Sequence, residues 1–290
     1  MTLTWPIVLA VLCGAVLHAG WNTLVKSSGD KEVDTALVHF LGALVALPPL
    51  LVFGLPPGVA WPYIGASLMV HIAYYLTLAG AYKRGDLGLT YPIMRGSAPL
   101  LVALGSSAVL GETLSPLAWF GVFGVTCGVA LVGLSNLGDT LQHRRALGFA
   151  LANACVIAVY TFIDGTGVRA TVAAGQLAVS YVMVLFVLDG IPYPALVYAR
   201  RDAAGRRAIL EYARKRWPLA ALGGAASMGS YTIALWAMTR APVASVSALR
   251  ETSVLFASAF GVWVLKERFG VQRAMGALVI VSGVVALRFG

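Results

Sequence analysis

The chain has 290 residues, of which 59% are hydrophobic and only 11% are charged, and its formal net charge is +9. Soluble domains carry roughly 25% charged residues, so this composition excludes a soluble fold because too few polar side chains remain to cover its surface. A nucleic-acid-binding face is also excluded, because the basic residues lie between apolar runs rather than along one stripe. The composition predicts an all-α integral membrane protein.

Ten segments are long and apolar enough to cross a bilayer, which takes about 20 residues. In chain order they are 5–25, 33–53, 61–82, 89–110, 116–134, 146–164, 175–198, 217–239, 243–265 and 270–288. None shows the alternating pattern of a membrane β-strand. The links between them are short, so sequential segments are expected to be antiparallel neighbours. The longest link, Arg200–Arg216, is interpreted as a basic connector.

The basic residues are distributed unevenly over the links. Of the 21 Lys and Arg residues, 16 lie in odd-numbered links, three lie in the termini and even-numbered links, and two lie within segments. Cytoplasmic loops carry an excess of basic residues. The bias predicts a multi-pass protein of the plasma membrane (the bacterial inner membrane) with its odd-numbered links in the cytoplasm and both termini outside.

An internal repeat relates the two halves of the chain. A shift of 155 residues superimposes identical residues in four places, pairing Arg95 with Arg250, Glu112 with Glu267, Gly121 with Gly276 and Gly128 with Gly283. Because each unit contains an odd number of segments, the second unit must enter the membrane from the opposite side. The sequence therefore predicts two inverted five-helix repeats, 1–135 and 146–290. Secondary transporters rock such repeats about a central site, although a duplication that serves only folding is the alternative.

The second half of each unit also carries a familiar pattern. It reads YPIMRGSAPLLVALGSSAVLGETLSPLAWFGVFGVTCGVALVG from Tyr91 and ALRETSVLFASAFGVWVLKERFGVQRAMGALVIVSGVVAL from Ala248. A helix ending in Gly-Glu or Lys-Glu, a short turn and a glycine-spaced helix resemble the EamA repeat of the drug/metabolite transporter superfamily. The sequence HAGWN at His18–Asn22, followed by Lys26, resembles the first helix of one bacterial branch.

This resemblance implies ten transmembrane helices around a central cavity, with the fourth and ninth helices among those that line it. Members of the superfamily export amino acids or other metabolites, or exchange phosphorylated sugars and nucleotide-sugars. Many of them keep both termini in the cytoplasm, which is opposite to the arrangement that the charge bias predicts here.

Arg95 and Arg250 are the first candidates for substrate binding. Each lies roughly 10 Å below the membrane surface at 1.5 Å per residue. A guanidinium facing lipid is costly, so both are expected to face the bundle interior. Two arginines related by the repeat would clamp an anion, because Arg binds carboxylate or phosphate through two parallel hydrogen bonds. The alternative is structural, with Arg250 paired to an acid or to carbonyl groups and Arg95 extended towards the interface.

Proton coupling has two candidates. Glu251 is interpreted as the only acid well inside a predicted segment, and it could exchange protons, bind a cation or neutralise a nearby arginine. His18 is the second candidate, because histidine exchanges protons near neutral pH. His71 is a candidate for substrate binding, although a lone histidine on an apolar face is more often a packing residue. No spacing of His, Cys and Asp indicates a metal site, and no cofactor is expected.

Aromatic residues are candidates for the walls of a solute pocket, because they combine an apolar body with a polar tip. The residues selected are Tyr75, Tyr91, Tyr160, Tyr231 and Trp236. Packing in the core, or a place in the interfacial belt, explains each of them equally well.

Other features are interpreted as architecture. Glu112 and Glu267 lie at segment ends, where capping or pairing is expected. The matched glycines fit close helix–helix approach. Pro92 and Pro99 each remove a backbone hydrogen bond and should bend the fourth segment.

These observations predict a secondary transporter, an exporter or exchanger of a small anionic or zwitterionic metabolite such as an amino acid or a phosphorylated or phosphonate compound. The alternative is proton-coupled efflux of a cation or drug through Glu251. An enzyme is not expected, since GxSxG, HExxH and GxxxxGK[ST] motifs are absent. The expected partners are a small-molecule solute and the lipid bilayer, without nucleic acid, for a monomer or homodimer.

Overall fold

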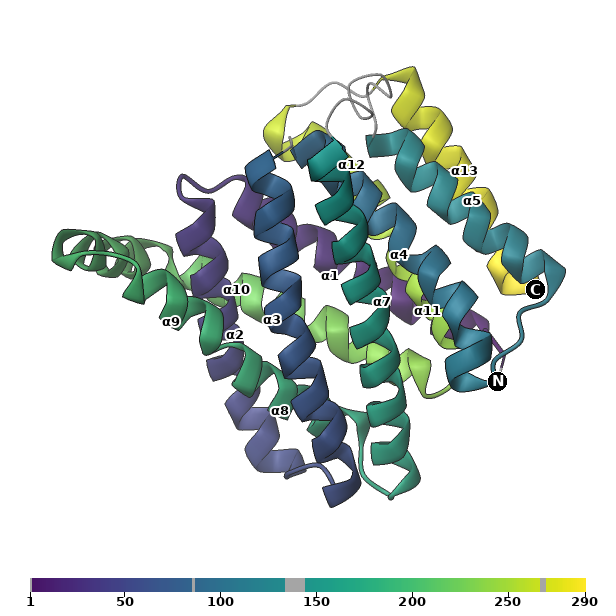
Figure 1. The fold of residues 1–290 in the computed structure, drawn as a ribbon, viewed down its shortest axis with the longest axis horizontal. Coiled ribbons are helices and arrows are strands. Elements are labelled where there is room, and N and C mark those ends of the chain that lie inside the picture. The colour runs from purple at the N-terminus through teal and green to yellow at the C-terminus, as the bar shows by residue number, and fades with distance from the viewer. Residues whose placement is uncertain (1, 85–86, 134–143, 267–269) are drawn as a thin grey trace.

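The structure is a computed structural model that describes residues 2–84, 87–133, 144–266 and 270–290. These residues are organised almost entirely as helices (Figure 1), which confirms the all-helical prediction. The elements are α1 (Trp5–Lys26), α2 (Lys31–Phe53), the 3₁₀ turn η1 (Gly58–Ala60), α3 (Trp61–Arg84), α4 (Leu87–Leu110), α5 (Pro116–Gly133), α7 (Arg144–Ala173), α8 (Ala178–Asp189), α9 (Pro192–Ala199), α10 (Ala203–Met238), α11 (Val243–Arg250), α12 (Ser253–Leu265) and α13 (Val271–Phe289).

Within the described ranges, seven helical stretches are long and apolar enough to cross a membrane. They are α1, α2, α4, α5, α7, the combined stretch of α8 and α9, and α13. The other three predicted segments correspond to α3, to the second part of α10, and to α11 with α12. Every predicted segment therefore coincides with helix, and the differences lie in where helices begin, end and break.

Two predicted segments are interrupted near their middle. The segment 175–198 divides into α8 and α9 before Pro192, which begins α9 because proline cannot continue a preceding helix. The segment 243–265 divides into α11 and α12 at Glu251 and Thr252. There the backbone hydrogen bonds reach back three residues instead of four. Glu251 N donates to Ala248 O and Thr252 N donates to Leu249 O, both at 3.1 Å. The Thr252 hydroxyl also donates to Leu249 O at 2.7 Å, which competes with the regular helical bond.

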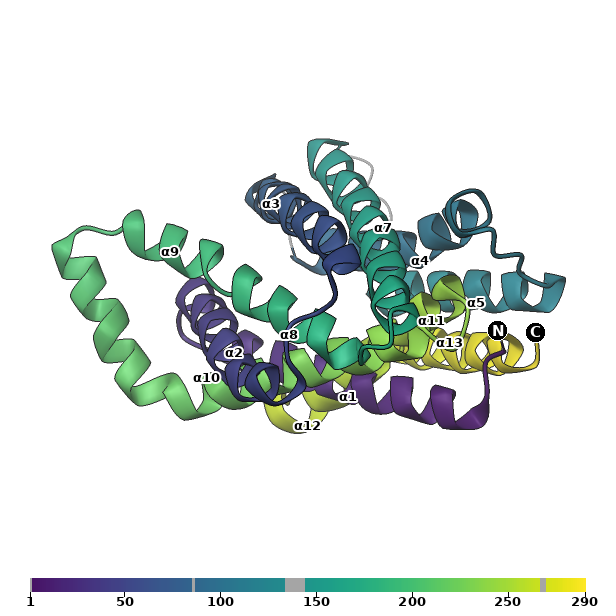
Figure 2. The ribbon, with the colours of Figure 1, turned by 90° about the horizontal axis from the view of Figure 1, so that it is seen from below.

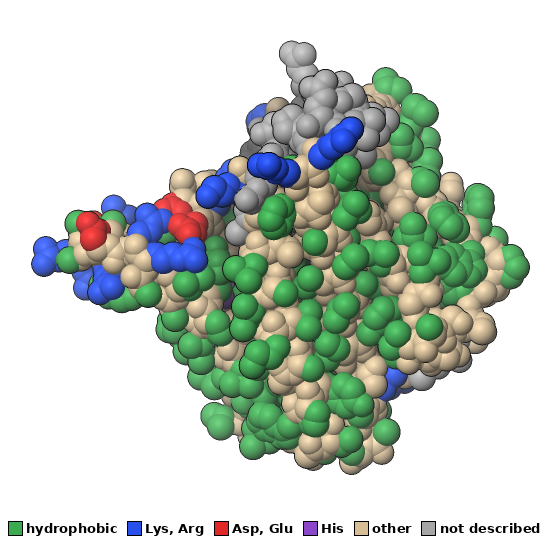
Figure 3. Space-filling view, in the orientation of Figure 1, with side chains coloured by type: hydrophobic (Ala, Val, Ile, Leu, Met, Phe, Trp, Pro, Cys, Tyr) green, Lys and Arg blue, Asp and Glu red, His purple; other side chains and the backbone are tan. Residues whose placement is uncertain are grey.

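The interpretation of 200–216 as a connector was wrong for most of its length. The helix α10 begins at Ala203 because the Asp202 side chain accepts a hydrogen bond from Gly205 N at 2.8 Å and caps the helix. The following residues, rich in Ala and Arg, favour helix. This basic part of α10 projects from the bundle together with α9 (Figures 1 and 2), and Lys and Arg gather on it (Figure 3).

Several of the helix–helix contacts recur when the two halves are exchanged. The contact of α3 with α7 corresponds to that of α10 with α1, and the contact of α4 with α7 corresponds to that of α11 and α12 with α1. The pairs α5–α13 and α2–α8 each join a helix to its own counterpart. In Figure 1, α1 rises from the N-terminus while its counterpart α7 descends, and both chain ends lie at the same end of the bundle.

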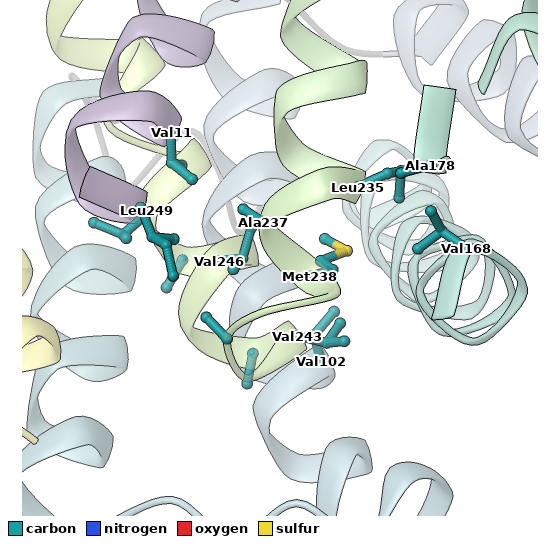
Figure 4. Close-up of a cluster of buried hydrophobic side chains, with 14 of the residues drawn as sticks. Val11, Val102, Val168, Ala178, Leu235, Ala237, Met238, Val243, Val246 and Leu249 are labelled. Atoms are coloured by element: carbon teal, nitrogen blue, oxygen red, sulfur yellow. The ribbon is translucent and has the colours of Figure 1, made fainter. Parts of the chain in front are cut away.

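The main core lies where helices of both halves meet. Figure 4 shows Val11 of α1 and Val102 of α4 near Met238 of α10 and Val246 of α11. These four side chains are between 0% and 1% exposed. The outer surface, by contrast, exposes large apolar side chains such as Leu51 at 84% and Trp263 at 76%. Contiguous apolar surface of this extent is typical of a protein surrounded by lipid.

Glycines allow α5 and α13 to approach closely. A Cβ atom on Gly128 would lie 2.5 Å from Ile280 Cγ1 and 2.8 Å from Gly276 O. A Cβ atom on Gly283 would lie 2.8 Å from Gly121 O. Because two of these contacts are with backbone oxygen, no side-chain movement would relieve them. The predicted close approach of glycine-bearing helices is confirmed.

Candidate functional site

A cavity of about 150 Å³ lies between the two halves of the bundle. Its walls come from α1, α2, α3 and α4 of the first half and from α7, α8, α10 and α11 of the second. The helices α5 and α13, which occupy equivalent places in the two halves, pack against each other and contribute none of the described lining residues. The cavity is therefore lined by equivalent helices of both halves.

Seven of the ten candidate site residues line this cavity. They are His18, His71, Tyr75, Arg95, Tyr160, Tyr231 and Arg250. The other three lie elsewhere. Tyr91 packs in a small cluster beside Met94, Trp236 packs against the main core, and Glu251 contacts Arg95 behind the cavity wall.

Arg95 of α4 forms an ion pair across the two halves. Its Nε atom lies 2.9 Å from Oε2 of Glu251, the residue that follows the end of α11. The two side chains are only 11% and 5% exposed. The Nε and Nη2 atoms of Arg95 and the Oε2 atom of Glu251 are buried, and none of them has a hydrogen-bond partner of good geometry among the described residues. The guanidinium is therefore held beside Glu251 by opposite charge, and its Nη2 atom lacks a protein acceptor within the described residues.

Arg250 has a different environment, although it occupies the equivalent position in the repeat. Its guanidinium carbon lies 5.2 Å from the centre of the Tyr231 ring, within the range of a cation–π interaction. The Tyr231 hydroxyl donates a short hydrogen bond to Asp164, which also accepts from the Tyr181 hydroxyl at 2.8 Å. The alternative to anion binding paired Arg250 with an acid or with carbonyl groups. Within the described residues, it is Arg95 that forms the ion pair with an acid.

The two histidine candidates contribute ring contacts to the wall. His71 stacks on Tyr160 with ring centres 4.8 Å apart, and its Nδ1 donates to Ser67 O at 2.8 Å. His18 meets Trp21 edge-on at 5.4 Å. These rings form an aromatic surface beside the two guanidiniums.

The expectation that Glu251 is the only acid well inside a segment was wrong. Asp189, the last residue of α8, lines the cavity, and its Oδ2 atom accepts from the Tyr75 hydroxyl at 3.0 Å and lies 3.8 Å from His39 Nδ1. Asp164 is completely buried within α7. A carboxylate inside an apolar segment is the signal by which both could have been found, because such groups are costly in a membrane unless they serve a partner or a site.

Glu112 has the helix-end role that was expected. Its Oε2 atom accepts from Val243 N at 2.9 Å, at the start of α11, and its Oε1 atom lies 2.5 Å from Arg169 Nη2. Arg169 Nε donates to Met238 O at 2.7 Å, at the end of α10. This network fixes the turn that leads into the interrupted ninth segment. The matching residue, Glu267, lies outside the described residues.

An apolar helical bundle whose two corresponding halves line a cavity with charged side chains has the architecture of a membrane transporter. The sequence model of the EamA-like transporter family matches residues 5–134 and 144–289. The chain therefore belongs to the EamA-like transporter family and is a membrane transporter of the drug/metabolite type.

The fold is shared with proteins of known structure. One solved crystal structure superposes with a TM-score of 0.77, covering 99% of this chain and 98% of that chain at 16% sequence identity. A search of curated proteins gives no match to the sequence. At this level of identity the solved structure shows the fold alone.

Proposed function

We propose that the chain is a secondary transporter of a small anionic or zwitterionic metabolite and that it works by alternating access. One observation carries the proposal: Arg95 and Arg250, from equivalent positions of the two halves, line the same cavity. Arginine binds carboxylate and phosphate groups through paired hydrogen bonds. A cavity of about 150 Å³ holds a molecule such as benzene, so the solute would have roughly six to eight non-hydrogen atoms.

The proposed architecture has ten crossings in two inverted repeats, residues 1–135 and 146–290. The opposite directions of α1 and α7 in Figure 1 support it, as do the contacts of α3 with α7 and of α10 with α1, which correspond when the halves are exchanged. Rocking of one repeat against the other would open the cavity to the two sides of the membrane in turn.

The proposed orientation places the odd-numbered links in the cytoplasm of a plasma membrane. It is supported by the basic arm formed by α9 and the first part of α10, because basic residues are concentrated on cytoplasmic loops (Figure 3). Both termini would then face the outside.

Glu251 is the proposed proton-coupling group, with His18 as the second candidate. An anionic solute and the Glu251 carboxylate compete for the guanidinium of Arg95, since the ion pair joins them at 2.9 Å. Protonation of Glu251 would release Arg95, so a proton and the anion would bind together. Efflux of a cation through Glu251 is less well supported, because this carboxylate faces Arg95 and lies behind the cavity wall.

The proposed substrate contacts include the aromatic wall as well as the arginines. Tyr75, Tyr160, Tyr231 and His71 would shape the pocket, because their rings line the cavity. Tyr91 and Trp236 are left out of this proposed set because they pack outside the lining.

The test is anion binding to the purified full chain in detergent, measured by calorimetry with inorganic phosphate and butyrate. We expect Arg250→Gln and Arg95→Gln each to weaken binding about 10- to 100-fold, the effect of losing a charge-assisted hydrogen bond. The matched control is Arg206→Gln on the exposed part of α10. Anion binding that is unchanged in both cavity variants, or stabilisation by cationic drugs alone, would show that the proposed anion clamp is wrong.

Transport itself requires a second measurement. The same variants in liposomes should show reduced exchange of radiolabelled anion across the bilayer, in proportion to their loss of binding. Protein that binds anions but supports no flux in either direction would refute the transport step while leaving the clamp intact.

A further inference from the structure

We propose that Asp189 forms a cation-binding end of the cavity, so that the preferred solute carries both an anionic group and an ammonium group. The inference rests on the proposed function for the arginine end and adds the recognition of a second charge. Asp189 is the one carboxylate among the described residues that line the cavity. It lies on α8, whereas Arg95 and Arg250 lie on α4 and α11.

The backbone around Asp189 favours a cation. Asp189 ends the 12-residue helix α8, whose C-terminal carbonyl groups carry a partial negative charge. The helix stops here because Gly190 and Pro192 follow and lead into α9. The side chain is only 18% exposed. A carboxylate and a helix C-terminus thus act together at one place in the cavity wall.

The carboxylate retains capacity to bind a donor. Both the Tyr75 hydroxyl and the His39 ring approach Oδ2, at 3.0 Å and 3.8 Å, and no hydrogen bond to Oδ1 occurs within the described part of the chain. Tyr75 is held in place by stacking on Tyr193 at 5.2 Å. The His39 ring lies beyond hydrogen-bonding distance of Oδ2, so a solute ammonium could approach the carboxylate of Asp189 and supply a counter-charge.

Aromatic side chains line the same cavity as the two arginines and Asp189. The Arg250 guanidinium carbon lies 5.2 Å from the Tyr231 ring centre, and the Phe186 ring centre lies 6.1 Å from that of Tyr231. Phe186 is one helical turn before Asp189 on α8. A simple anion bound to the arginines would therefore leave Asp189 unpaired in the same cavity. A molecule with charged groups at both ends would satisfy both.

The solute class that fits is an anion joined to a primary ammonium by a short chain. An ω-amino carboxylate and an aminoalkyl phosphonate share this chemistry, and both can have roughly six to eight non-hydrogen atoms, in keeping with the volume of the cavity. The experiment uses one pair of probes with a carboxylate and one pair with a phosphonate. Within each pair only the ammonium group differs, so its contribution to binding is measured separately from that of the anionic group.

The probes are 4-aminobutyrate against butyrate, and 2-aminoethylphosphonate against ethylphosphonate. Their dissociation constants are measured by calorimetry on the full chain in detergent. We expect the ammonium-bearing member of at least one pair to bind the wild-type protein about 10- to 100-fold more tightly than its partner. Asp189→Asn should abolish this preference, Asp189→Glu should keep it, and the exposed control Glu32→Gln should leave it unchanged.

Equal binding of both members of each pair to the wild-type protein overturns the proposal, and this measurement does not depend on the folding of any variant. A preference that survives in Asp189→Asn, with the helical circular dichroism of the wild type, also overturns it. Failure of all four probes to bind, or binding that is insensitive to Arg250→Gln, would instead refute the anion clamp on which the inference rests.

Discussion

The buried ion pair between Arg95 and Glu251 offers the sharpest test of how the two halves are joined. The perturbations are Arg95→Gln, Glu251→Gln and the two combined. Each single change removes one charge and leaves its partner buried, because the side chains are 11% and 5% exposed. The combined change leaves two neutral amides of similar size in the same place.

The expected magnitudes follow from the geometry. At 2.9 Å, the Coulomb attraction is about 6 kcal/mol with an effective dielectric constant of ~20, most of it offset by desolvation of both groups. Removal of one partner from a buried pair costs about 3–5 kcal/mol, because the other charge remains without compensation. The double variant should be less destabilised than the sum of the single variants, with a coupling energy of about 2–3 kcal/mol.

The assay is equilibrium unfolding of the purified protein in mixed micelles, followed by tryptophan fluorescence as the fraction of denaturing detergent increases. The matched control is the exposed pair Arg201–Glu32, which has a similar separation of 2.6 Å but side chains 40% and 46% exposed. Its coupling should be below about 1 kcal/mol, since solvent screens exposed pairs. Free energies of unfolding that add within about 0.5 kcal/mol for Arg95 and Glu251 would refute the reasoning.

Three further predictions concern packing, the interrupted ninth segment and orientation. Gly128→Leu should lower the free energy of unfolding by at least about 1–3 kcal/mol, because its Cβ would lie 2.8 Å from Gly276 O, whereas Gly148→Leu, with nothing within 4 Å, should be nearly neutral in the same assay. Arg169→Gln should cost about 3 kcal/mol by removing the charged partner of Glu112, which would keep only the hydrogen bond from Val243 N, and an effect no larger than that of the exposed control Arg207→Gln would contradict this. In a background without native cysteines, an impermeant thiol reagent applied to intact cells should label Gln176→Cys but label Arg207→Cys only after lysis. The reverse pattern would invert the proposed topology.

The fold could be predicted largely from the sequence because each segment carries its own signal. A run of about 20 apolar residues is sufficient to indicate a membrane helix, and helix formation depends on bonds within that run. The recurrence of Arg95 and Gly128 at Arg250 and Gly283 likewise revealed the repeat without any knowledge of contacts. The glycine pattern predicted the close contact of α5 and α13, because small residues are selected where helices approach.

The helix breaks and the extent of α10 were harder to predict. The start of α10 depends on the cap that Asp202 provides, and hydropathy does not register a cap. The break after Arg250 depends on a hydroxyl bond from Thr252 to Leu249 O and on the burial of Glu251 beside Arg95. Arg95 is distant from Glu251 in the sequence, so the apolar pattern of residues 243–265 does not indicate that the helix breaks there.

The sequence by itself determined that the chain is a helical membrane protein with two related halves and that each half contributes an arginine. Those properties depend on composition and on periodicity along the chain. Only the tertiary structure decided that the two arginines are not equivalent, with Arg95 paired to Glu251 and Arg250 lying over Tyr231. It also decided that Asp189 shares their cavity. The physical reason is that charge pairing depends on separations of a few ångströms between different helices, and these are set by how the halves pack rather than by position along the chain.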